Sequence, residues 1–467
     1  MAQPNLITNS SQKMSKAHMI GWVLTVVIPF IIFLIPTGEF FSSSMKLFLM
    51  ISTAMLCIII FENMHLIVPA ILMPILYVLT GLAPAAMVYN PWASFVPWMT
   101  LGGFIFAATF NRIGLLKRIS YWCILKTGGT FTGILYGLTT AGIIINILVP
   151  GVVAIPMAAF AVGLCLALGL GKSREAGAIC MVAAMSVLTS GVFVYNQIVI
   201  VMGLGQTVAP DIYITLWDNL LHNIPFIFIM YFTVFIVDKI YKKGNTLTNI
   251  KERVMEDQAK LGPMSSDEKK SVGVCLAVLV FLMTEVVHGI PIGWGIAIGA
   301  LLLFFPGINV GNDKDIKEVN FSILFLVTAF MAMGGVAGYN GWGIQLGEIF
   351  MPHLAEATDT GLVMMLMGLI FTLNLVLTPL AIQYSLVAPM TQVAMEIGLN
   401  PIVVWYMFVH AVDLIVIPYQ YVLYLVFFSF GLIYMSDFVK IALLKLALHA
   451  VFIPLVVVPW WRLMGLL

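Results

Sequence analysis

Charged side chains are scarce in this 467-residue chain. Only 9% of its residues are Asp, Glu, Lys or Arg, 61% are hydrophobic, and the mean hydropathy is +1.06. A soluble globular chain carries about 25% charged residues, so a water-soluble surface is excluded. The apolar runs are continuous and about 20 residues long, as a membrane-spanning helix requires. Outer-membrane β-barrels are excluded because their strands alternate apolar and polar residues. The sequence therefore predicts an all-α polytopic protein of the lipid bilayer.

The chain also lacks the residue patterns of catalytic and metal-binding sites. Its five cysteines form no CxxC pair and stand in apolar segments, which predicts buried free thiols. The seven histidines show no metal-ligand spacing, and no phosphate loop or pair of catalytic carboxylates occurs. The net charge of +1, without a basic tail, gives no indication of nucleic-acid binding. We expect no enzyme activity, no cofactor and no metal centre.

The 22 lysines and arginines are grouped in a way that predicts topology. If the N-terminus is cytoplasmic, only Lys46 and Arg462 fall outside the cytoplasmic face. Positive charge retained on that face sets orientation. In this scheme Lys440 and Lys445 open the last span on the cytoplasmic side. The apolar run from about residue 18 to residue 36 is too long for a signal peptide, and it predicts the first span of a multi-pass protein of the plasma (inner) membrane.

The order of the parts predicts two membrane repeats of opposite orientation. A cytoplasmic N-terminus, residues 1–18, precedes the first repeat, 19–237, and a polar cytoplasmic linker, 238–271, precedes the second repeat, 272–467. Each repeat has a Gly-rich helix, a short amphipathic piece, a Pro-containing apolar pair and a long interrupted helix. The first amphipathic piece is basic and the second is acidic, which is expected if they lie on opposite membrane faces. Inverted repeats are typical of secondary transporters.

Two apolar stretches, at about 130–170 and 361–397, are interrupted by prolines. The interruptions are Pro150 and Pro156 in the first stretch and Pro379 and Pro389 in the second. A proline removes a backbone hydrogen bond, and broken backbone at membrane depth must be surrounded by protein or by a water-filled cavity. The first stretch also begins and ends among cytoplasmic charges. We therefore expect two re-entrant helical hairpins, with Pro-kinked full spans as the alternative.

Two segments near the end of the first third of the chain carry a family resemblance. They read "FENMHLIVPAILMPILYVLTGLAP" and "WMTLGGFIFAATFNRIGLLKRIS". They resemble the divalent anion:sodium symporter family, carriers of dicarboxylates, citrate and sulfate within the wider ion transporter superfamily. The resemblance extends weakly along the chain to "WWRLMGLL". It implies a homodimer with eleven spans and two re-entrant hairpins per protomer, and a transport domain that moves as an elevator against a scaffold domain. Glu62 stands at the family's acidic position, where we expect a structural role.

The chain departs from the family pattern at the hairpin tips and in the interrupted helices. The family's Ser-Asn-Thr tips are replaced by Asn146-Ile147-Leu148 and Pro379-Leu380-Ala381. Its Thr-Pro-Pro-Asn stretches are replaced by Phe193-Val194-Tyr195-Asn196 and Tyr421-Val422-Leu423-Tyr424. The chain therefore resembles a divergent member of the family, or a member of a sister family in the wider ion transporter superfamily, with a pocket altered for a different anion.

The candidate site residues are polar but mostly uncharged. No Lys or Arg occurs between Arg174 and Lys239 or between Lys317 and Lys440, so helix ends, amides and hydroxyls must hold an anion there. The substrate-binding candidates are Asn146, Asn196, Gln383, Ser385, Thr378, Tyr421 and Tyr424. The candidates for ion binding or proton relay are Asn146, Pro150, Gly151, Thr189, Ser190, Asp413 and His410. For each, the alternative is a satisfied interhelical hydrogen bond.

Asp413 and His410 are ionisable residues three positions apart in an apolar segment. On a continuous helix they would share one face, and ionisable groups within a span are usually functional. We expect Asp413 to hold Na⁺ or to relay a proton, with His410 as its partner. A structural carboxylate–imidazole pair is the alternative.

These patterns together predict a secondary active transporter of a small organic anion, with Na⁺ as the coupling ion. The expected substrate is di- or tricarboxylate-like or sulfonate-like, and the other expected partners are the lipid bilayer and a second copy of the chain. Anion exchange or H⁺ coupling on the same fold is the alternative mechanism, since the hairpin tips are changed and Asp413 is available. A channel-like or accessory membrane protein is a more distant alternative.

Overall fold

All regular structure in the described part of the chain is helical. The computed structural model describes residues 16–38, 41–61, 63–148, 154–194, 197–241, 250–341, 357–375, 379–421, 424, 427 and 431–467. The helices of the first half are α1 (Lys16–Leu34), α2 (Ser43–Ile60), α3 (Ile67–Leu79), α4 (Ala85–Val88), α5 (Phe95–Ile113), α6 (Leu115–Lys126), α7 (Phe131–Leu148), α8 (Ala154–Ala167), α9 (Arg174–Leu188), α10 (Gln197–Gly205), α11 (Leu216–Asn223) and α12 (Pro225–Tyr241).

The second half also contains both short and long helices. After α13 (Ile250–Lys260) in the predicted linker come α14 (Ser266–Met283), α15 (Glu285–His288), α16 (Ile292–Leu302), α17 (Asp313–Lys317), α18 (Phe321–Tyr339), α20 (Asp359–Asn374), α21 (Pro379–Glu396), α22 (Pro401–Ala411), α24 (Met435–Phe452) and α25 (Val458–Leu463). Four short turns of other helix types are η1 (Asn90–Ala93), η2 (Thr189–Val192), η3 (Pro418–Gln420) and η4 (Ile453–Val457).

Several apolar segments form helices that are long enough to cross a membrane. Among the described residues, three helices are long and apolar enough to cross a membrane: α9 continued by η2, α18, and α24 continued through α25. Two bent pairs, α5 with α6 and α11 with α12, pass the same test as pairs. Shorter apolar helices, including α1, α2, α3, α7 and α20, surround them. The prediction of a multi-pass, all-helical membrane protein is confirmed, whereas the eleven spans stay a prediction.

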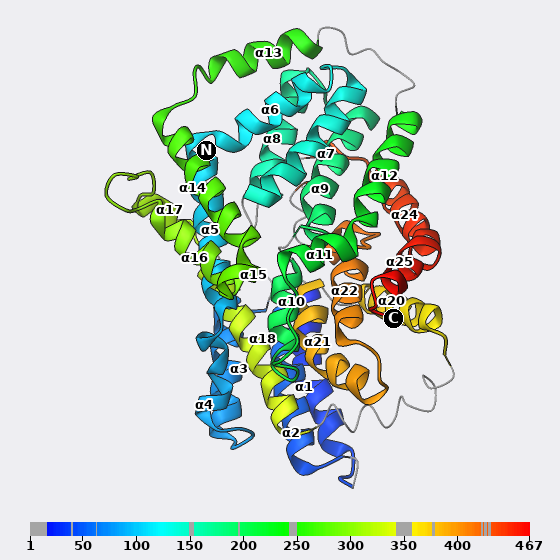
Figure 1. Cartoon of the computed structure of the whole chain (residues 1–467). Coiled ribbons are helices and arrows are strands. Elements are labelled where there is room, and N and C mark those ends of the chain that lie inside the picture. The colour runs from blue at the N-terminus through cyan, green and yellow to red at the C-terminus, as the bar shows by residue number, and fades with distance from the viewer. Residues whose placement is uncertain are drawn as a thin grey trace.

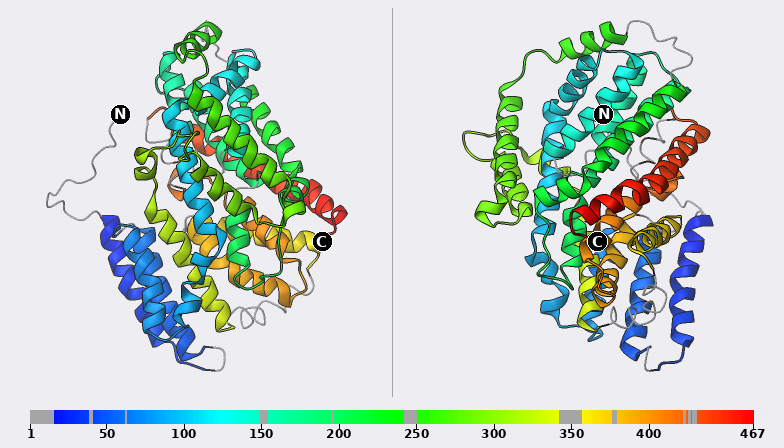
Figure 2. Two further views of the ribbon diagram at one scale, coloured as in Figure 1. Left: turned by 60° about the vertical axis from the view of Figure 1, so that its left-hand side comes forward. Right: turned by 45° about the vertical axis from the view of Figure 1, so that its right-hand side comes forward.

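Different groups of helices make up the two ends and the middle of the molecule. Figure 1 shows α6, α7 and α8 toward one end, α1 to α4 toward the other, and α10 and α22 between them. In both views of Figure 2, α1 and α2 stand side by side at an edge of the molecule, and they pack against each other. The outer face of α1 exposes large apolar side chains such as Val26 and Phe30. Such faces are expected on lipid-facing helices, because lipid tails are as apolar as the side chains.

The core lies around α9 and α22. Every residue of α9 from Ala176 to Leu188 is buried, and α22 is buried from Val403 to Ala411. Neighbours of α9 are α7, α8, α12 and α24, while α22 packs on α10, α20 and α21. All five cysteines are buried thiols outside any disulfide in the described part of the chain, as predicted from their apolar surroundings.

The basic amphipathic piece of the first half forms the separate helix α6. Gly114 ends α5 at φ 83°, a conformation that glycine adopts without strain, and α6 leaves at a bend of 71°. Arg118 of α6 donates to the Glu268 carboxylate of α14, with Nε at 2.6 Å from Oε1. Burial raises the pKa of Glu268, but the hydrogen bonds from Arg118 and Ser265 lower it by more than burial raises it. The net shift of the pKa is therefore downward. In the acidic counterpart of the second half, Glu348 and Glu356 lie outside the described residues, and Asp359 begins α20.

The two Pro-interrupted stretches each form two short helices. The first stretch contains α7 and α8, of 18 and 14 residues, and the second contains α20 and α21, of 16 and 18 residues. At 1.5 Å per residue, 14 residues extend only about 21 Å, which is less than the hydrocarbon thickness of about 30 Å. The connections between the paired helices, at residues 149–153 and 376–378, lie outside the described residues and include Pro150, Gly151 and Thr378.

Candidate functional site

The first helix break follows α9. The α-helix ends at Leu188, a 3₁₀ turn covers Thr189–Val192, and α10 begins at Gln197. The sequence there is Thr-Ser-Gly, and hydroxyl side chains compete with the helix for backbone partners. Ser190 illustrates this competition, because its Oγ donates to the Ser186 carbonyl at 2.5 Å. Asn196, predicted to bind substrate at this break, lies outside the described residues.

Asn146, two residues before the end of α7, is bonded to this break. Its Nδ2 donates to the Val187 carbonyl at 2.7 Å and lies 2.5 Å from Ser190 Oγ. Its amide oxygen is buried and has no hydrogen-bond partner among the described residues. The sequence therefore selected two residues, Asn146 and Ser190, that the fold brings into contact, while their role as ligands stays a prediction.

The second helix break follows α22. The helix ends at Ala411, the chain becomes extended near Ile417, and η3 follows. Gln420 folds back over this segment, since its Oε1 accepts from the backbone N–H groups of Val416 and Ile417 at 2.8 and 2.6 Å. Its Nε2 donates to the carbonyl of Asn374 at 2.7 Å. The side-chain amide of Gln420 thus satisfies backbone groups at the break that would otherwise form helical hydrogen bonds.

Asn374, the last residue of α20, stands at the second break as Asn146 stands at the first. Its Nδ2 donates at 3.0 Å to the carbonyl of Val412, directly after α22. Its amide oxygen is also buried without a partner in the described part of the chain. Asn374 is not among the site residues predicted from the sequence, although an Asn in the apolar run before Pro379 was a signal that could have found it.

A buried ion pair joins the second break to the first. Lys445 of α24 places its Nζ 2.5 Å from Asp413 Oδ2, and the two side chains are 3% and 4% exposed. The same Nζ donates to the carbonyl of Asp413 and to Thr189 Oγ1, each at 2.9 Å. The expected position of Lys445 at the cytoplasmic start of the last span is therefore wrong. Lys445 is the eleventh residue of α24, about 15 Å along the helix, and it brings a basic group to a region expected to have none.

The expected pairing of His410 with Asp413 is also wrong. His410 Nε2 lies 3.0 Å from Asn223 Oδ1, and its ring stacks on Phe226 at a centroid distance of 3.7 Å. Because α22 ends at Ala411, residues 410 and 413 do not share a continuous helix face. His410 therefore belongs to a packing contact with α11 and α12, and Asp413 belongs to the break.

The remaining candidates lie near the second break without converging on one point. Gln383 is buried in α21, and its Nε2 donates to the Phe408 carbonyl at 3.3 Å. Ser385 is half-buried two residues further along α21, and its Oγ lies 3.5 Å from the Ile382 carbonyl. The rings of Tyr421 and Tyr424 lie 6.4 Å apart after η3. Glu62, like Asn196 and Thr378, lies outside the described residues.

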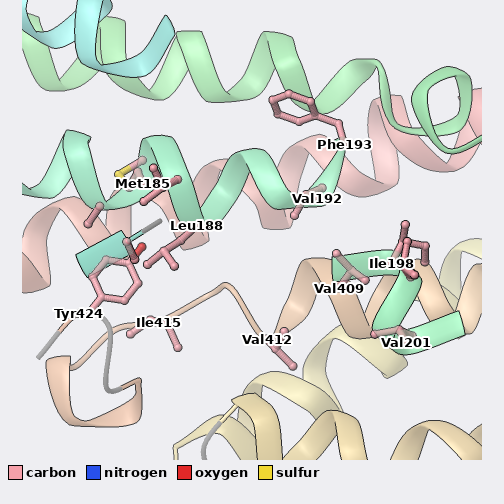
Figure 3. Close-up of a cluster of buried hydrophobic side chains, with 14 of the residues drawn as sticks. Met185, Leu188, Val192, Phe193, Ile198, Val201, Val409, Val412, Ile415 and Tyr424 are labelled. Carbon is pink, nitrogen blue, oxygen red and sulfur yellow. The ribbon is translucent and has the colours of Figure 1, made fainter. Parts of the chain in front are cut away.

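The two breaks lie next to each other. Turn η2 packs on α22, α10 packs on α22, and α24 packs on α9. Figure 3 shows the shared apolar cluster, drawn from both breaks: Met185, Leu188, Val192, Phe193, Ile198, Val201, Val409, Val412, Ile415 and Tyr424. Polar groups at the breaks are therefore enclosed by apolar side chains, which strengthens their electrostatic interactions. Among the described residues, no group of three or more His, Cys, Asp or Glu could hold a metal ion.

Two adjacent broken helices with buried amide and hydroxyl groups suit a chain that binds ions or small solutes within the membrane. A family model described as the sodium:sulfate symporter transmembrane region matches residues 16–467. The chain belongs to the sodium:sulfate symporter family. Its resemblance to the divalent anion:sodium symporters is thereby confirmed, and the family is one of membrane carriers rather than enzymes. No curated protein matches the chain.

Proposed function

We propose that this member of the sodium:sulfate symporter family is a secondary active transporter that moves a small organic anion together with Na⁺. The anion is di- or tricarboxylate-like or sulfonate-like. The observation that carries the proposal is the pair of asparagines, Asn146 and Asn374, each bonded to a carbonyl at a helix break and each with a buried amide oxygen lacking a partner among the described residues. Hard cations such as Na⁺ favour oxygen ligands of this kind, by analogy with Ca²⁺ and Mg²⁺.

The anion binds without a free basic side chain. Broken helices direct free N–H groups and the positive end of the helix dipole toward a negative ligand. Helix α10 begins at Gln197, directly after the first break, and supplies such an N-terminus. Lys445 is already paired with Asp413, so its charge is neutralised. Substrate affinity then comes from helix ends, amides and hydroxyls.

Transport follows an elevator mechanism between two inverted repeats. The likeness of the two breaks supports this view, because each combines a first hairpin helix ending near an Asn with a buried helix broken beside it. The repeats are 19–237 and 272–467, the N-terminus is cytoplasmic, the membrane is the plasma membrane, and the functional unit is a homodimer. The short helices α8 and α20 favour re-entrant hairpins over full spans.

Anion exchange or H⁺ coupling is a second candidate mechanism. The observation that favours it is the Asp413–Lys445 pair, since a carboxylate that is already paired with an ammonium is not free to hold Na⁺. Under this mechanism, uptake depends on internal anion or on a proton gradient and is insensitive to Na⁺.

Uptake into proteoliposomes distinguishes these mechanisms. Labelled succinate, citrate, tartrate, sulfate and a sulfonate are each offered under an imposed Na⁺, H⁺ or counter-anion gradient. We expect accumulation of one of these anions driven by the Na⁺ gradient. Accumulation driven only by the other gradients favours the second mechanism, and no gradient-driven accumulation contradicts both. Sustained, non-saturating conductance in electrical recordings would instead indicate a channel.

A further inference from the structure

The Lys445 ammonium lies among three oxygens of different kinds. They are the hydroxyl of Thr189, the backbone carbonyl of Asp413 and a carboxylate oxygen of Asp413, at 2.9, 2.9 and 2.5 Å from Nζ. An ammonium has three N–H donors, so each donor finds one oxygen. The side chains of Lys445 and Asp413 are almost fully buried, which means that these contacts replace water as the solvation of the charge.

The oxygens belong to two different broken helices. Thr189 opens the 3₁₀ turn after α9, and Asp413 lies in the non-helical segment after α22. A carbonyl freed by a helix break, a hydroxyl and a carboxylate are the ligand types with which broken membrane helices coordinate a cation. Lys445 reaches them from a third element, α24, which packs on α9.

The charge balance of this pocket depends on Lys445. Asp413 brings one negative charge, and among the described residues its ion-pair partner is Lys445. The other ionisable groups nearby are Tyr421 and Tyr424 of the same segment and His449, whose Nδ1 lies 2.8 Å from the Lys445 carbonyl. The two tyrosines cannot carry a positive charge, and the His449 ring is bonded to the Lys445 backbone rather than to Asp413.

We propose that Lys445 is a tethered cation that fills a Na⁺-sized oxygen pocket between the two broken helices. The pocket is formed by Thr189 and Asp413, and the ammonium occupies the place of a free cation. Removing the ammonium opens the pocket to Na⁺. The charge in this pocket does not depend on which ion drives transport in the unaltered protein.

A structural consequence follows for the transport cycle. A tethered ammonium cannot dissociate with the substrate, so this pocket stays charged in every state in which α24 remains docked. The two breaks are then held together permanently at this point, and any coupling ion must bind elsewhere, for example at Asn146 or Asn374.

The test measures Na⁺ binding and thermal stability of purified Lys445→Ala and Lys445→Met. Melting temperature is followed between about 1 and 100 mM NaCl, with choline chloride keeping ionic strength constant, and we expect a rise of roughly 5 °C beyond that of the unaltered protein. Bound ²²Na⁺ should increase by one ion per protomer. Lys440→Ala, an exposed lysine on the same helix, is the matched control and should leave both quantities unchanged.

The double variant Lys445→Ala with Asp413→Asn decides the cause of the effect. It removes both charges, so the additional Na⁺ binding and the additional rise in melting temperature should disappear. Folded single variants without additional Na⁺ binding would overturn the proposal. So would single variants that fail to fold even in NaCl, or a double variant that retains the additional Na⁺. If the unaltered protein shows no Na⁺-driven uptake, the proposed function is contradicted. The Na⁺ binding expected of the Lys445 variants does not depend on that outcome.

Discussion

The two helix breaks share one architecture and differ in charge. At both, an Asn near the end of a preceding helix donates to a carbonyl of the broken helix. Among the described residues, the first break carries the hydroxyls of Thr189 and Ser190 and no charged side chain, whereas the second contains the carboxylate of Asp413. The single ammonium of Lys445 contacts both breaks. This difference indicates that the neutral amide and hydroxyl groups position the backbone at each break. The Asp413–Lys445 ion pair links the two breaks to each other.

The largest expected effect comes from removing the Asp413 carboxylate, the charged group of the second break. Asp413→Ala leaves the Lys445 ammonium buried and unpaired, so we expect the free energy of unfolding to fall by about 3–5 kcal/mol. The measurement is denaturant unfolding of the detergent-solubilised protein. The control is Asp359→Ala, which breaks the half-exposed Asp359–Arg462 pair and should cost no more than about 1 kcal/mol. Equal losses for the two variants would mean that the second break is not special.

The likeness of the breaks is tested by replacing their asparagines. Asn146→Leu and Asn374→Leu each leave a carbonyl at a break without its amide donor, which should cost about 1–3 kcal/mol. If the amide oxygens hold Na⁺, each change should also lower Na⁺ affinity in uptake assays by about 10-fold or more. Asn340→Leu removes a similar amide donor at the end of α18, away from the breaks, and should leave Na⁺ dependence unchanged. A large effect at one break alone would contradict their functional equivalence.

The bend between α5 and α6 provides a smaller, backbone-only test outside the breaks. Gly114 is left-handed at φ 83°, and an added Cβ would meet no atom within 4 Å. Gly114→Ala should therefore destabilise by about 1–2 kcal/mol through backbone conformation alone. Gly163→Ala, in the interior of α8 with equally open surroundings, should be neutral or stabilising, since alanine favours helix. Melting temperatures of the two variants give the comparison, and a stabilising Gly114→Ala would contradict it.

The smallest effect concerns the ion pair between Arg118 of α6 and Glu268 of α14, away from the breaks. Glu268 has a lowered pKa when folded, so its pairing with Arg118 stabilises the fold above the unfolded pKa of about 4.3. That stability is lost as the pH falls through the folded pKa. We expect a loss of about 1 kcal/mol, because Arg118 is partly exposed. The fall in melting temperature between neutral and acidic pH should be smaller in Glu268→Gln, and an unchanged pH profile would exclude this contribution.

Much of the fold could be predicted from the sequence because it depends on local composition. Continuous apolar runs predicted the helices, and the basic amphipathic run predicted α6. The same reasoning selected Asn146, Ser190, Thr189 and Asp413, since polar groups are rare in apolar segments. The family match adds that this pattern belongs to a carrier.

Only the tertiary structure decided which of these polar groups meet. Lys445 lies 32 residues from Asp413 and 256 residues from Thr189, so no local pattern could assign it to the breaks. Its place in the sequence is equally compatible with a cytoplasmic helix end. His410 contacts Asn223 instead of Asp413 because α22 ends between them. The sequence by itself determined a membrane carrier with very few charges, and helix docking decided that one of those charges is buried between its two broken helices.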